Sequence, residues 1–315
     1  MWPAPVELLH HAQLGPADLM IVDIMLPYYG SVPLMQAAVR SVMAQSDPGW
    51  RLTVVDDGTE PGVPEWFAGI DDERVRYQRN ERNLGITANY RKCVGLAEHE
   101  YLVMMGTDDI MHPNYVATVR SVIEQYPGVG MVQPGVEVID ADGTVVNTIV
   151  DLAKRRLYAP RIDSRELMGG EDLAASLLRG CWFYFPSICW RTDAIKAVDF
   201  REEFQVIQDL ALVIDLIQRG EQMAVDDTLC FQYRRHAVSK SSADAVNGSR
   251  FTEARAFFID VARRMDEQGW PRAARAARRY TSSRVHAITM LPTAVLSGKM
   301  AGVRSLSRHA FGPGR

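Results

Sequence analysis

The chain has 315 residues, 47% hydrophobic and 23% charged, a composition typical of a folded globular protein and not of a disordered one. Its net charge of −4 conceals an asymmetry, because 13 Lys or Arg residues stand against four Asp or Glu from Arg250 onward. The first 249 residues are therefore strongly acidic, which argues against nucleic acid as their partner.

Strands and helices alternate along the first half of the predicted fold. Residues 20–26 predict a buried strand, and apolar side chains at helical spacing predict a helix over 34–43 with Ser31 as its N-cap. Further strands are expected at 51–55, 75–78, 101–105 and 129–133, separated by helical segments within 61–70, 87–98 and 113–125. This alternation predicts an α/β, Rossmann-like fold with a doubly wound, mostly parallel sheet.

The second half follows a looser pattern. A hairpin is expected over 136–150 around Asp142-Gly143, then a basic loop over 152–166, a helix at 173–178 and a strand at 187–191. A helix at 208–219 precedes two strands at 222–225 and 229–234. A Ser- and Ala-rich stretch at 239–247 is expected to be mobile, and two helices, 252–268 and 270–289, follow it.

Carboxylates come directly after two of the predicted strands. Asp56-Asp57 follow one and Asp108-Asp109 the other. The carboxyl ends of parallel strands meet at the edge where open α/β sheets bind ligands, and aspartate is costly to bury, so a nucleotide and a hard divalent cation would explain both pairs. The alternative is that they are only turn or N-cap residues. Asp209, at a predicted helix start, is a third acid whose alternative role is to complement the helix dipole.

The same residues could bind a nucleoside diphosphate-sugar. Pro27-Tyr28-Tyr29 could wall a slot for the base, and Asp56 or Asp57 could accept hydrogen bonds from the base or the ribose. Asp108 or Asp109 could hold Mg²⁺ or Mn²⁺ through oxygen. An acceptor hydroxyl would then need a general base near the sugar.

These stretches resemble family 2 glycosyltransferases with the GT-A fold. The similarity follows the family's order over about residues 20–242 through IVDIMLPYYGS, SVMAQSDPGWRLTVVDDGT, NERNLGITANYRKC, EYLVMMGTDDIMHPNYV, FPSICWRTDAI, IQDLALVIDL and YRRHAVSKSS. It implies an inverting enzyme that transfers a sugar from a nucleoside diphosphate-sugar, UDP-sugar by default, to an acceptor hydroxyl. Polysaccharide or glycoconjugate biosynthesis is the implied setting.

The resemblance also implies roles for individual residues. Asp209 matches the catalytic base, and Asp108 and His236 match positions that hold a Mn²⁺ or Mg²⁺ cofactor. The implied nucleotide-sugar site consists of Pro27, Tyr28, Tyr29, Asp56, Asp57, Asn83, Gly85, Asn89, Arg91, Asp108, Asp109 and Arg235.

Three positions depart from the family pattern. Gly106 replaces the first acid of the D-x-D metal motif, so metal ligation would rest on Asp108 with phosphate and water oxygens. The cation expected after the Asn-x-Gly loop shifts to Arg91. Gln208 replaces an acid before the base, which leaves Asp209 as the base candidate of that motif. Arg91, Arg235 and His236 would face the leaving diphosphate together with Arg234.

The resemblance divides the chain into two predicted parts. Residues 1–249 would form the GT-A catalytic domain, with a nucleotide-sugar half at about 18–135 and an acceptor half at about 136–249. Residues 250–315 would form a basic helical extension, in which Arg272, Arg275 and Arg279 share one helix face. That face either packs beside the catalytic domain in solvent or contacts anionic lipid, which would suit a lipid-linked rather than a free carbohydrate acceptor. Self-association through these helices is a further alternative.

The expected location is cytoplasmic, at the inner membrane surface if the basic helices bind lipid. The first residues lack the pattern of a signal peptide, and no run of about 18 apolar residues predicts a spanning helix. Two other functions remain open from the sequence: a sugar nucleotidyltransferase, which would want a glycine-rich basic loop after the first strand, and an inactive nucleotide-sugar-binding module. No G-x-G-x-x-G or G-x-x-x-x-G-K-[ST] loop is present.

Overall fold

The computed structural model describes residues 20–147, 152, 154–235, 249–296, 298 and 300–312. Its first half alternates strands and helices much as predicted. The elements in order are β1 (Val22–Tyr28), α1 (Val32–Met43), β2 (Trp50–Asp56), α2 (Val63–Ala68), β3 (Val75–Arg79), α3 (Ile86–Leu96), β4 (Tyr101–Met104), β5 (Ile110–Met111), α4 (Tyr115–Gln125) and β6 (Met131–Ile139).

The second half adds three strands and most of the helices. The elements are a π-helical turn η1 (Lys154–Tyr158), β7 (Arg165–Met168), α6 (Gly170–Arg179), a 3-10 turn η2 (Phe185–Ser187), β8 (Cys189–Arg191), α7 (Thr192–Lys196), α8 (Gln208–Gln218), β9 (Met223–Arg234), α10 (Ser249–Glu267), α11 (Pro271–Arg279), α12 (Thr281–Leu296) and α13 (Met300–Phe311).

One nine-stranded sheet runs through the described residues in the order β3-β2-β1-β4-β8-β6-β9-β5, with β7 also paired to β9. Strands β3, β2, β1 and β4 are mutually parallel, whereas β8 lies antiparallel between β4 and β6. The predicted α/β class is therefore confirmed, but the sheet is mixed and not wholly parallel. The mostly parallel arrangement is as predicted, and the antiparallel element within it is the short strand β8, which comes from far downstream and inserts between β4 and β6.

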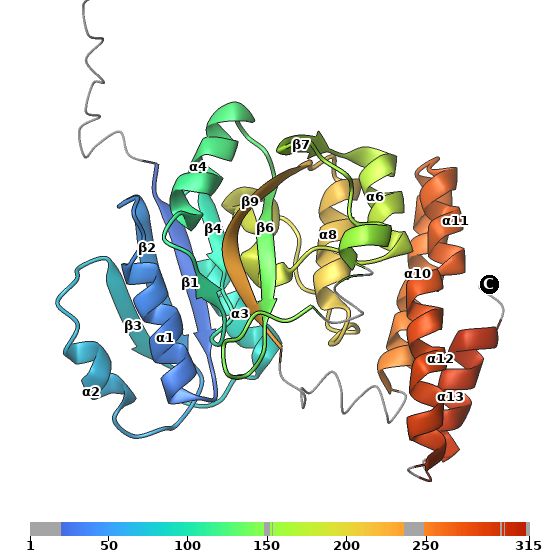
Figure 1. The fold of residues 1–315 in the computed structure, drawn as a ribbon, viewed down its shortest axis with the longest axis horizontal. Coiled ribbons are helices and arrows are strands. Elements are labelled where there is room, and N and C mark those ends of the chain that lie inside the picture. Colours follow the sequence, from blue (N-terminus) through green and yellow to red (C-terminus); the bar gives the residue numbers. More distant parts are fainter. Residues whose placement is uncertain are drawn as a thin grey trace, which may run out of the picture.

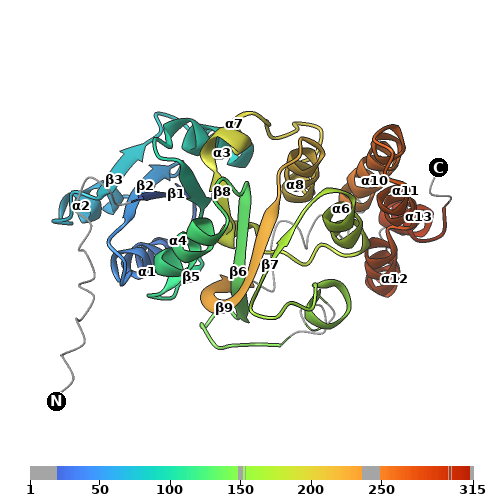
Figure 2. The same ribbon diagram turned by 90° about the horizontal axis from the view of Figure 1, so that it is seen from above.

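Helices cover both faces of this sheet because the strand side chains alternate between two apolar clusters. In β1, Val22, Ile24 and Leu26 face the cluster shared with α1 and α4, whereas Met25 faces the cluster shared with α6 and α8. Figure 2 shows α1 and α4 on one side of β1 and β4, and α3 on the other. Because helices cover both faces, the ends of the strands form the open edge of the sheet.

The C-terminal helices extend the second layer. Phe257 and Val261 of α10 and Ala273 and Ala277 of α11 are fully buried in the same cluster as α6 and α8. Helices α12 and α13 form a smaller cluster with Phe251. Figure 1 shows these helices at the end of the molecule remote from β3. The division at 249/250 stays a prediction, and the expected mobile stretch 239–247 lies outside the described residues.

Several element predictions need correction. The two expected strands 222–225 and 229–234 are one strand, β9, whose register against β6 shifts on both sides of Gly135. A Cβ on Gly135 would stand 2.6 Å from the carbonyl oxygen of Asp227, so the close approach of β9 requires glycine there. The hairpin expected over 136–150 reduces, among described residues, to a bridge between Ile139 and Val145.

Two further differences lie in segments that the sequence assigned to one state. The helix expected over 270–289 is broken in two at Tyr280, whose φ of 29° is outside the helical range. The expected basic loop 152–166 contains η1 and the beginning of β7. None of the described helices is both long and apolar enough to span a bilayer.

Candidate functional site

The predicted acidic positions lie at the carboxyl ends of adjacent strands. β1 pairs with β2 on one side, where Tyr28 is opposite Asp56, and with β4 on the other. Asp57 follows β2, and Asp108 and Asp109 follow β4. The open edge of the sheet therefore gathers these side chains in one region.

Neighbouring protein groups bind the carboxylate of Asp56. Its side chain is fully buried, and it accepts hydrogen bonds from the Tyr77 hydroxyl (2.6 Å), the Arg79 Nε (2.7 Å) and the Gly58 amide (2.8 Å). Burial, followed by the hydrogen bond and charge of Asp56, raises the pKa of Tyr77. The carboxylate thus fixes the end of β2 against β3.

Asp57 organises the loop that follows β3. Its Oδ1 accepts from the Leu84 amide and the Asn80 side chain, both at 2.8 Å, and its Oδ2 accepts from the Gly85 amide at 2.9 Å. The Asn83 side chain donates to the Asp57 carbonyl at 2.8 Å. Gly85 has φ of +81°, which glycine adopts without strain. The predicted residues Asp57, Asn83 and Gly85 therefore form one loop structure.

Asn89 lies behind that loop. It is 3% exposed, donates to the Val55 carbonyl and accepts from Asn80 at 3.0 Å. Asn80, which the sequence analysis did not single out, therefore bridges Asp57 and Asn89. Its position directly after β3 is the sequence feature that could have identified it as a site residue.

Arg91 does not point its charge toward the acidic edge. Its guanidinium binds Asp199 (2.7 Å), Glu202 (2.8 Å) and the Phe200 carbonyl (2.7 Å). The expectation that it supplies the cation beside a leaving diphosphate therefore lacks support, because two carboxylates of another segment already neutralise it. These partners lie more than a hundred residues away in sequence and could not be anticipated.

The residues expected to wall a base slot differ in exposure. Tyr29 is 67% exposed and Pro27 half-buried, whereas Tyr28 exposes none of its side chain and donates its hydroxyl to the Gly30 carbonyl at 2.9 Å. Burial, with the charges of Glu60 and Asp56 adding to it, raises the pKa of Tyr28 to about 12. Tyr28 therefore supports this wall from behind and presents no surface to a ligand.

Asp109 carries an unusual burial for a carboxylate. It is 1% exposed, and its Oδ1 accepts from the Arg234 amide at 2.8 Å. Its Oδ2 is buried without a hydrogen-bond partner among the described residues. Burial and then the neighbouring Asp108 charge raise the pKa of Asp109 well above its usual range. A buried carboxylate oxygen without a hydrogen-bond partner is a candidate position for binding a ligand.

The geometry around Asp109 also explains Gly106. A Cβ on Gly106 would stand 2.3 Å from the Asp109 Oδ2 and 3.3 Å from the Asp108 Oδ1. The space beside residue 106 is therefore filled by the carboxylate of Asp109, and oxygens of both aspartates face the same point. The Asp109 carboxylate thus takes the place that the side chain of the motif's first acid would occupy.

The basic residues after β9 divide into two groups. Arg234 is buried and donates to the Asp108, Asp140 and Ala141 carbonyls, so its guanidinium ties loops together and is not available to a diphosphate. Arg235 is half-buried, with its guanidinium carbon 5.8 Å from the Tyr233 ring centroid. His236 lies outside the described residues.

Asp209 lies in the first turn of α8, and contacts bring that turn to the acidic edge. The Thr87 hydroxyl at the start of α3 donates to the Gln208 Oε1 at 3.3 Å. On the other side, the Glu253 carboxylate of α10 accepts from the Val206 and Ile207 amides at 2.7 and 2.9 Å. The start of α8 is thereby held between α3 and α10.

Two tyrosines report that the three acids share one environment. Burial first, and then charges that include Asp109, Asp108 and Asp209, raise the pKa of Tyr90, and the same three carboxylates help raise that of Tyr233 to about 12. These carboxylates thus contribute to the electrostatic surroundings of both phenols. Neither tyrosine was predicted as a site residue, because Tyr90 lies in α3 and Tyr233 near the end of β9 without a pattern that distinguishes them.

A divalent cation fits the Asp108–Asp109 pair. The unpartnered Asp109 Oδ2 and the Asp108 carboxylate supply hard oxygen ligands, which Mn²⁺ and Mg²⁺ accept. Across the part of the chain that the structure describes, no three His, Cys, Asp or Glu side chains gather into a complete metal site. The described residues alone would therefore supply part of a coordination shell, which substrate phosphates could complete.

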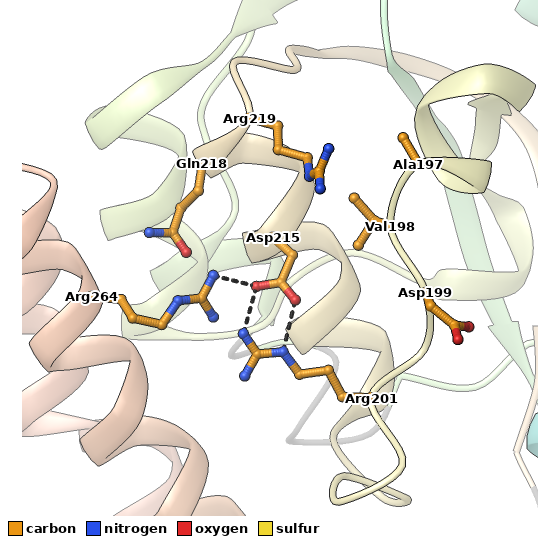
Figure 3. Close-up of a pocket in the computed structure, with 8 residues that line it drawn as sticks. All are labelled: Ala197, Val198, Asp199, Arg201, Asp215, Gln218, Arg219 and Arg264. Atoms are coloured by element: carbon orange, nitrogen blue, oxygen red, sulfur yellow. Dashed lines mark hydrogen bonds and ion pairs between the residues drawn. The ribbon is translucent and has the colours of Figure 1, made fainter.

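A cavity of about 380 Å³ lies elsewhere, toward the opposite end of α8 from Asp209. Figure 3 shows Asp215 between the guanidinium groups of Arg201 and Arg264, which bind it. Because ion pairs fill its centre and the acidic edge lies at the other end of the helix, we do not assign the reaction to it.

Comparison with known proteins gives the family. The profile described as Glycosyl transferase family 2 matches residues 23–190, more than half of the chain. The Succinoglycan biosynthesis protein ExoO of Rhizobium meliloti (strain 1021) is 25% identical over 223 residues, covering 70% of this chain and 62% of that protein. The Uncharacterized protein y4gI of Sinorhizobium fredii is 28% identical over 242 residues, covering 75% of this chain and 24% of that protein.

Several curated relatives are much longer than the region they share with this chain. The match spans 34% of the Putative colanic acid biosynthesis glycosyl transferase WcaA of Escherichia coli (strain K12) and 45% of the Putative glycosyltransferase EpsE of Bacillus subtilis (strain 168). In each case the chain spans less than half of the relative's length.

A solved structure gives the fold. Residues 1–349 of S. aureus TarS in complex with UDP-GlcNAc match with a TM-score of 0.61 at 12% identity, covering 92% of this chain and 91% of that one. The mixed sheet with its flanking helices is thus the GT-A fold that the sequence predicted. The family profile establishes that the chain belongs to glycosyl transferase family 2.

Proposed function

We propose that this glycosyltransferase moves a sugar from a nucleoside diphosphate-sugar, with UDP-sugar favoured, to an acceptor hydroxyl with inversion at the anomeric carbon. The observation that carries the proposal is the placement of Asp108 and Asp109 at the carboxyl end of β4, beside β1, with the first turn of α8, which bears Asp209, hydrogen-bonded to the start of α3 through Gln208 and Thr87. The preference for UDP draws support from the similar TarS structures, which hold UDP-GlcNAc and UDP.

The donor's nucleotide would lie at the edge formed by β1 and β2. Pro27 and the exposed Tyr29 ring would wall the base slot, and the loop carrying Asn83 and Gly85 would close it. Asp57 holds that loop, while Tyr28, Asp56 and Asn89 support the slot from behind. Arg235 would face the diphosphate.

Asp108 and Asp109 would hold the divalent cation, and His236 remains a proposed third ligand. A bound cation would neutralise charge on the donor diphosphate and favour its departure. Asp109 is buried beside Asp108 and its pKa is raised, so a bound cation would offset the cost of holding its negative charge there.

Asp209 would act as the general base. Its carboxylate would take the proton of the acceptor hydroxyl as that oxygen bonds to the sugar's anomeric carbon and the bond to the diphosphate breaks on the opposite side. A positioned base of this kind is worth roughly 10²–10⁴ in rate. This acid lies in the first turn of α8, where the helix dipole favours a negative charge.

The acceptor would be a carbohydrate or a lipid-linked saccharide, and the enzyme would work in the cytoplasm, at the inner membrane surface when its acceptor is lipid-linked. The relatives named in succinoglycan and colanic acid biosynthesis support a role in polysaccharide assembly.

A donor screen followed by product analysis tests the proposal. We expect UDP-sugars with Mn²⁺ to raise the melting temperature more than GDP- or dTDP-sugars, and more than UDP-sugars without metal. NMR of the product should show the anomeric configuration inverted relative to the donor. Retention of configuration would contradict the role of Asp209, and donor binding without any UDP release would indicate a binding module.

A further inference from the structure

Helix α12 exposes an apolar stripe. Val285, Ile288, Val295 and Leu296 are 52%, 43%, 59% and 89% exposed, and Pro292 lies among them. The spacing i, i+3, i+7, i+10 and i+11 places all five on one face of the helix. A contiguous apolar face in contact with water usually marks an interaction surface.

This face is distinct from the one that packs in the fold. Ala287 and Ala294 are fully buried against Leu306 and Ala310 of α13 and Phe251 of α10. Helix α12 is therefore apolar on two sides, of which folding uses one.

The surrounding charge selects the partner. From Gln268 to Arg315 the sequence holds nine Lys or Arg and no Asp or Glu. On α13, exposed Arg304 and Arg308 share an outward face with Met300 and Phe311, which are 62% and 69% exposed. A purely basic, partly apolar surface is complementary to an anionic one and repels the same surface of a second copy.

We propose that the α12–α13 hairpin docks on an anionic lipid bilayer surface. The apolar side chains would enter the boundary between headgroups and acyl chains, and Arg304 and Arg308 would bind lipid phosphates. In Figure 1 the C-terminal end of α12 and the N-terminal end of α13 lie on the same side of the molecule as the carboxyl end of β1. Docking would thus turn the acidic edge toward the membrane, where a lipid-linked acceptor is held.

The docking surface is not the arginine face that the sequence pointed to. Arg272, Arg275 and Arg279 of α11 line a cavity of about 320 Å³ shared with α6. Arg272 is already paired with Glu171 at 3.0 Å and Asp172 at 2.6 Å. That face therefore packs beside the catalytic body, as the alternative interpretation of the sequence expected, and the lipid contact moves to the next two helices.

Cosedimentation with vesicles tests the proposal without any need for turnover, so its failure is separate from failure of the proposed transfer reaction. The purified chain should bind vesicles of phosphatidylcholine mixed with phosphatidylglycerol at low salt, and bind vesicles of phosphatidylcholine alone far less. Val295→Ser with Leu296→Ser should lower partitioning about tenfold, since both side chains lose apolar contact. Arg304→Ala and Arg308→Ala should each lower it about fivefold.

Leu157→Ser is the matched control, because Leu157 is 73% exposed on η1, outside these helices, and should leave binding unchanged. No binding of the wild-type chain to anionic vesicles, or binding that survives the Val295→Ser, Leu296→Ser change, would overturn the proposal. A dimer in light scattering that dissociates on the same change would also overturn it, in favour of a second copy as occupant.

Discussion

At the scale of single residues, Gly106 and Asp109 show how a neighbouring carboxylate can require a glycine. The sequence shows only that an acid is missing at position 106. The structure shows that Asp109 reaches back into the space which a side chain at 106 would occupy, 2.3 Å from the position of its Cβ. The glycine is therefore a requirement of the Asp109 carboxylate and not simply a lost ligand.

Gly106→Ala should separate this steric role from general destabilisation. The new methyl group must displace the Asp109 carboxylate, whose other oxygen is held by the Arg234 amide, so we expect metal-dependent donor affinity to fall about tenfold. Titration calorimetry with a UDP-sugar and Mn²⁺ measures this. Gly95→Ala is the control, because nothing lies within 4 Å of a Cβ at that α3 position.

If Gly106→Ala and Gly95→Ala bound the donor equally well, the Asp109 carboxylate would have no part in holding it.

Individual site residues were predictable to the extent that their role is local. The acid pairs at the ends of β2 and β4 follow from strand pattern and chain position. The surroundings of Arg91 and Tyr28 were not predictable, because residues far away in the sequence determine them. Asp199 and Glu202, over a hundred residues away, neutralise Arg91, and the sheet buries the Tyr28 ring. Tertiary contacts of this kind leave no mark on a single sequence.

At the scale of elements, α10 helps to place the first turn of α8, which carries the proposed base Asp209. The Oε1 atom of Glu253 accepts hydrogen bonds from the backbone amides of both Val206 and Ile207. These residues directly precede Gln208 and Asp209, and α8 has no side-chain cap of its own. The C-terminal extension therefore contributes to the geometry of the site as well as to the core.

Glu253→Ala should lower kcat about tenfold while leaving the KM for the donor unchanged, because the base loses its positioning and the nucleotide edge does not. Glu253→Gln keeps an acceptor oxygen and should restore most of the rate. Steady-state kinetics of both variants, with Glu267→Ala as an exposed control on the same helix, provide the measurement. A parallel loss in Glu253→Gln would argue against this positioning role.

The elements themselves were predictable where one periodicity governs them. β1 to β4 and the helices between them match within a few residues, because each has a buried strand pattern or one apolar helix face. Prediction failed where the pairing with neighbouring strands determines the element. The sequence of β9 predicts two strands because Asp226-Asp227-Thr228 interrupts its apolar pattern, yet β6 and β7 pair along it. The break at Tyr280 has no Gly or Pro to signal it.

The C-terminal hairpin should depend on pH through His309 of α13. Burial lowers the pKa of His309 from its ordinary value of 6.5 to about 4. The unfolded chain therefore binds more protons than the folded one between these values, so the stability is present above the unfolded pKa and lost as pH falls toward the folded one. We expect hydrogen exchange in α13 to accelerate between pH about 7 and about 5, after correction for intrinsic rates. His309→Gln should weaken this dependence, and an unchanged profile would contradict the assignment.

At the scale of the whole molecule, a network of charges joins the catalytic body to the C-terminal helices. Asp215 of α8 binds Arg201 at 2.8 Å and Arg264 of α10 at 2.6 Å, and Asp260 adds a second carboxylate, 3.1 Å from Arg201 (Figure 3). These side chains are mostly buried, so each charge depends on its partners.

Asp215→Ala should lower the free energy of unfolding by about 3 kcal/mol, since it leaves the half-buried guanidinium groups of Arg201 and Arg264 to share the carboxylate of Asp260. Asp266→Ala removes the partner of Arg278 in an exposed pair and should cost less than about 1 kcal/mol. Urea denaturation followed by circular dichroism measures both. Equal effects of the two changes would mean that the network does not hold the extension in place.

The central claim is that acids from separate parts of the chain serve one reaction, with Asp209 acting on the acceptor and not on the donor. Asp209→Asn tests it most directly when transfer and donor binding are measured on the same preparation. We predict a loss of at least about 10² in transfer rate with Mn²⁺-dependent UDP-sugar affinity unchanged, while Glu203→Gln, an exposed acid nearby, transfers normally. Near-wild-type transfer by Asp209→Asn would contradict the account.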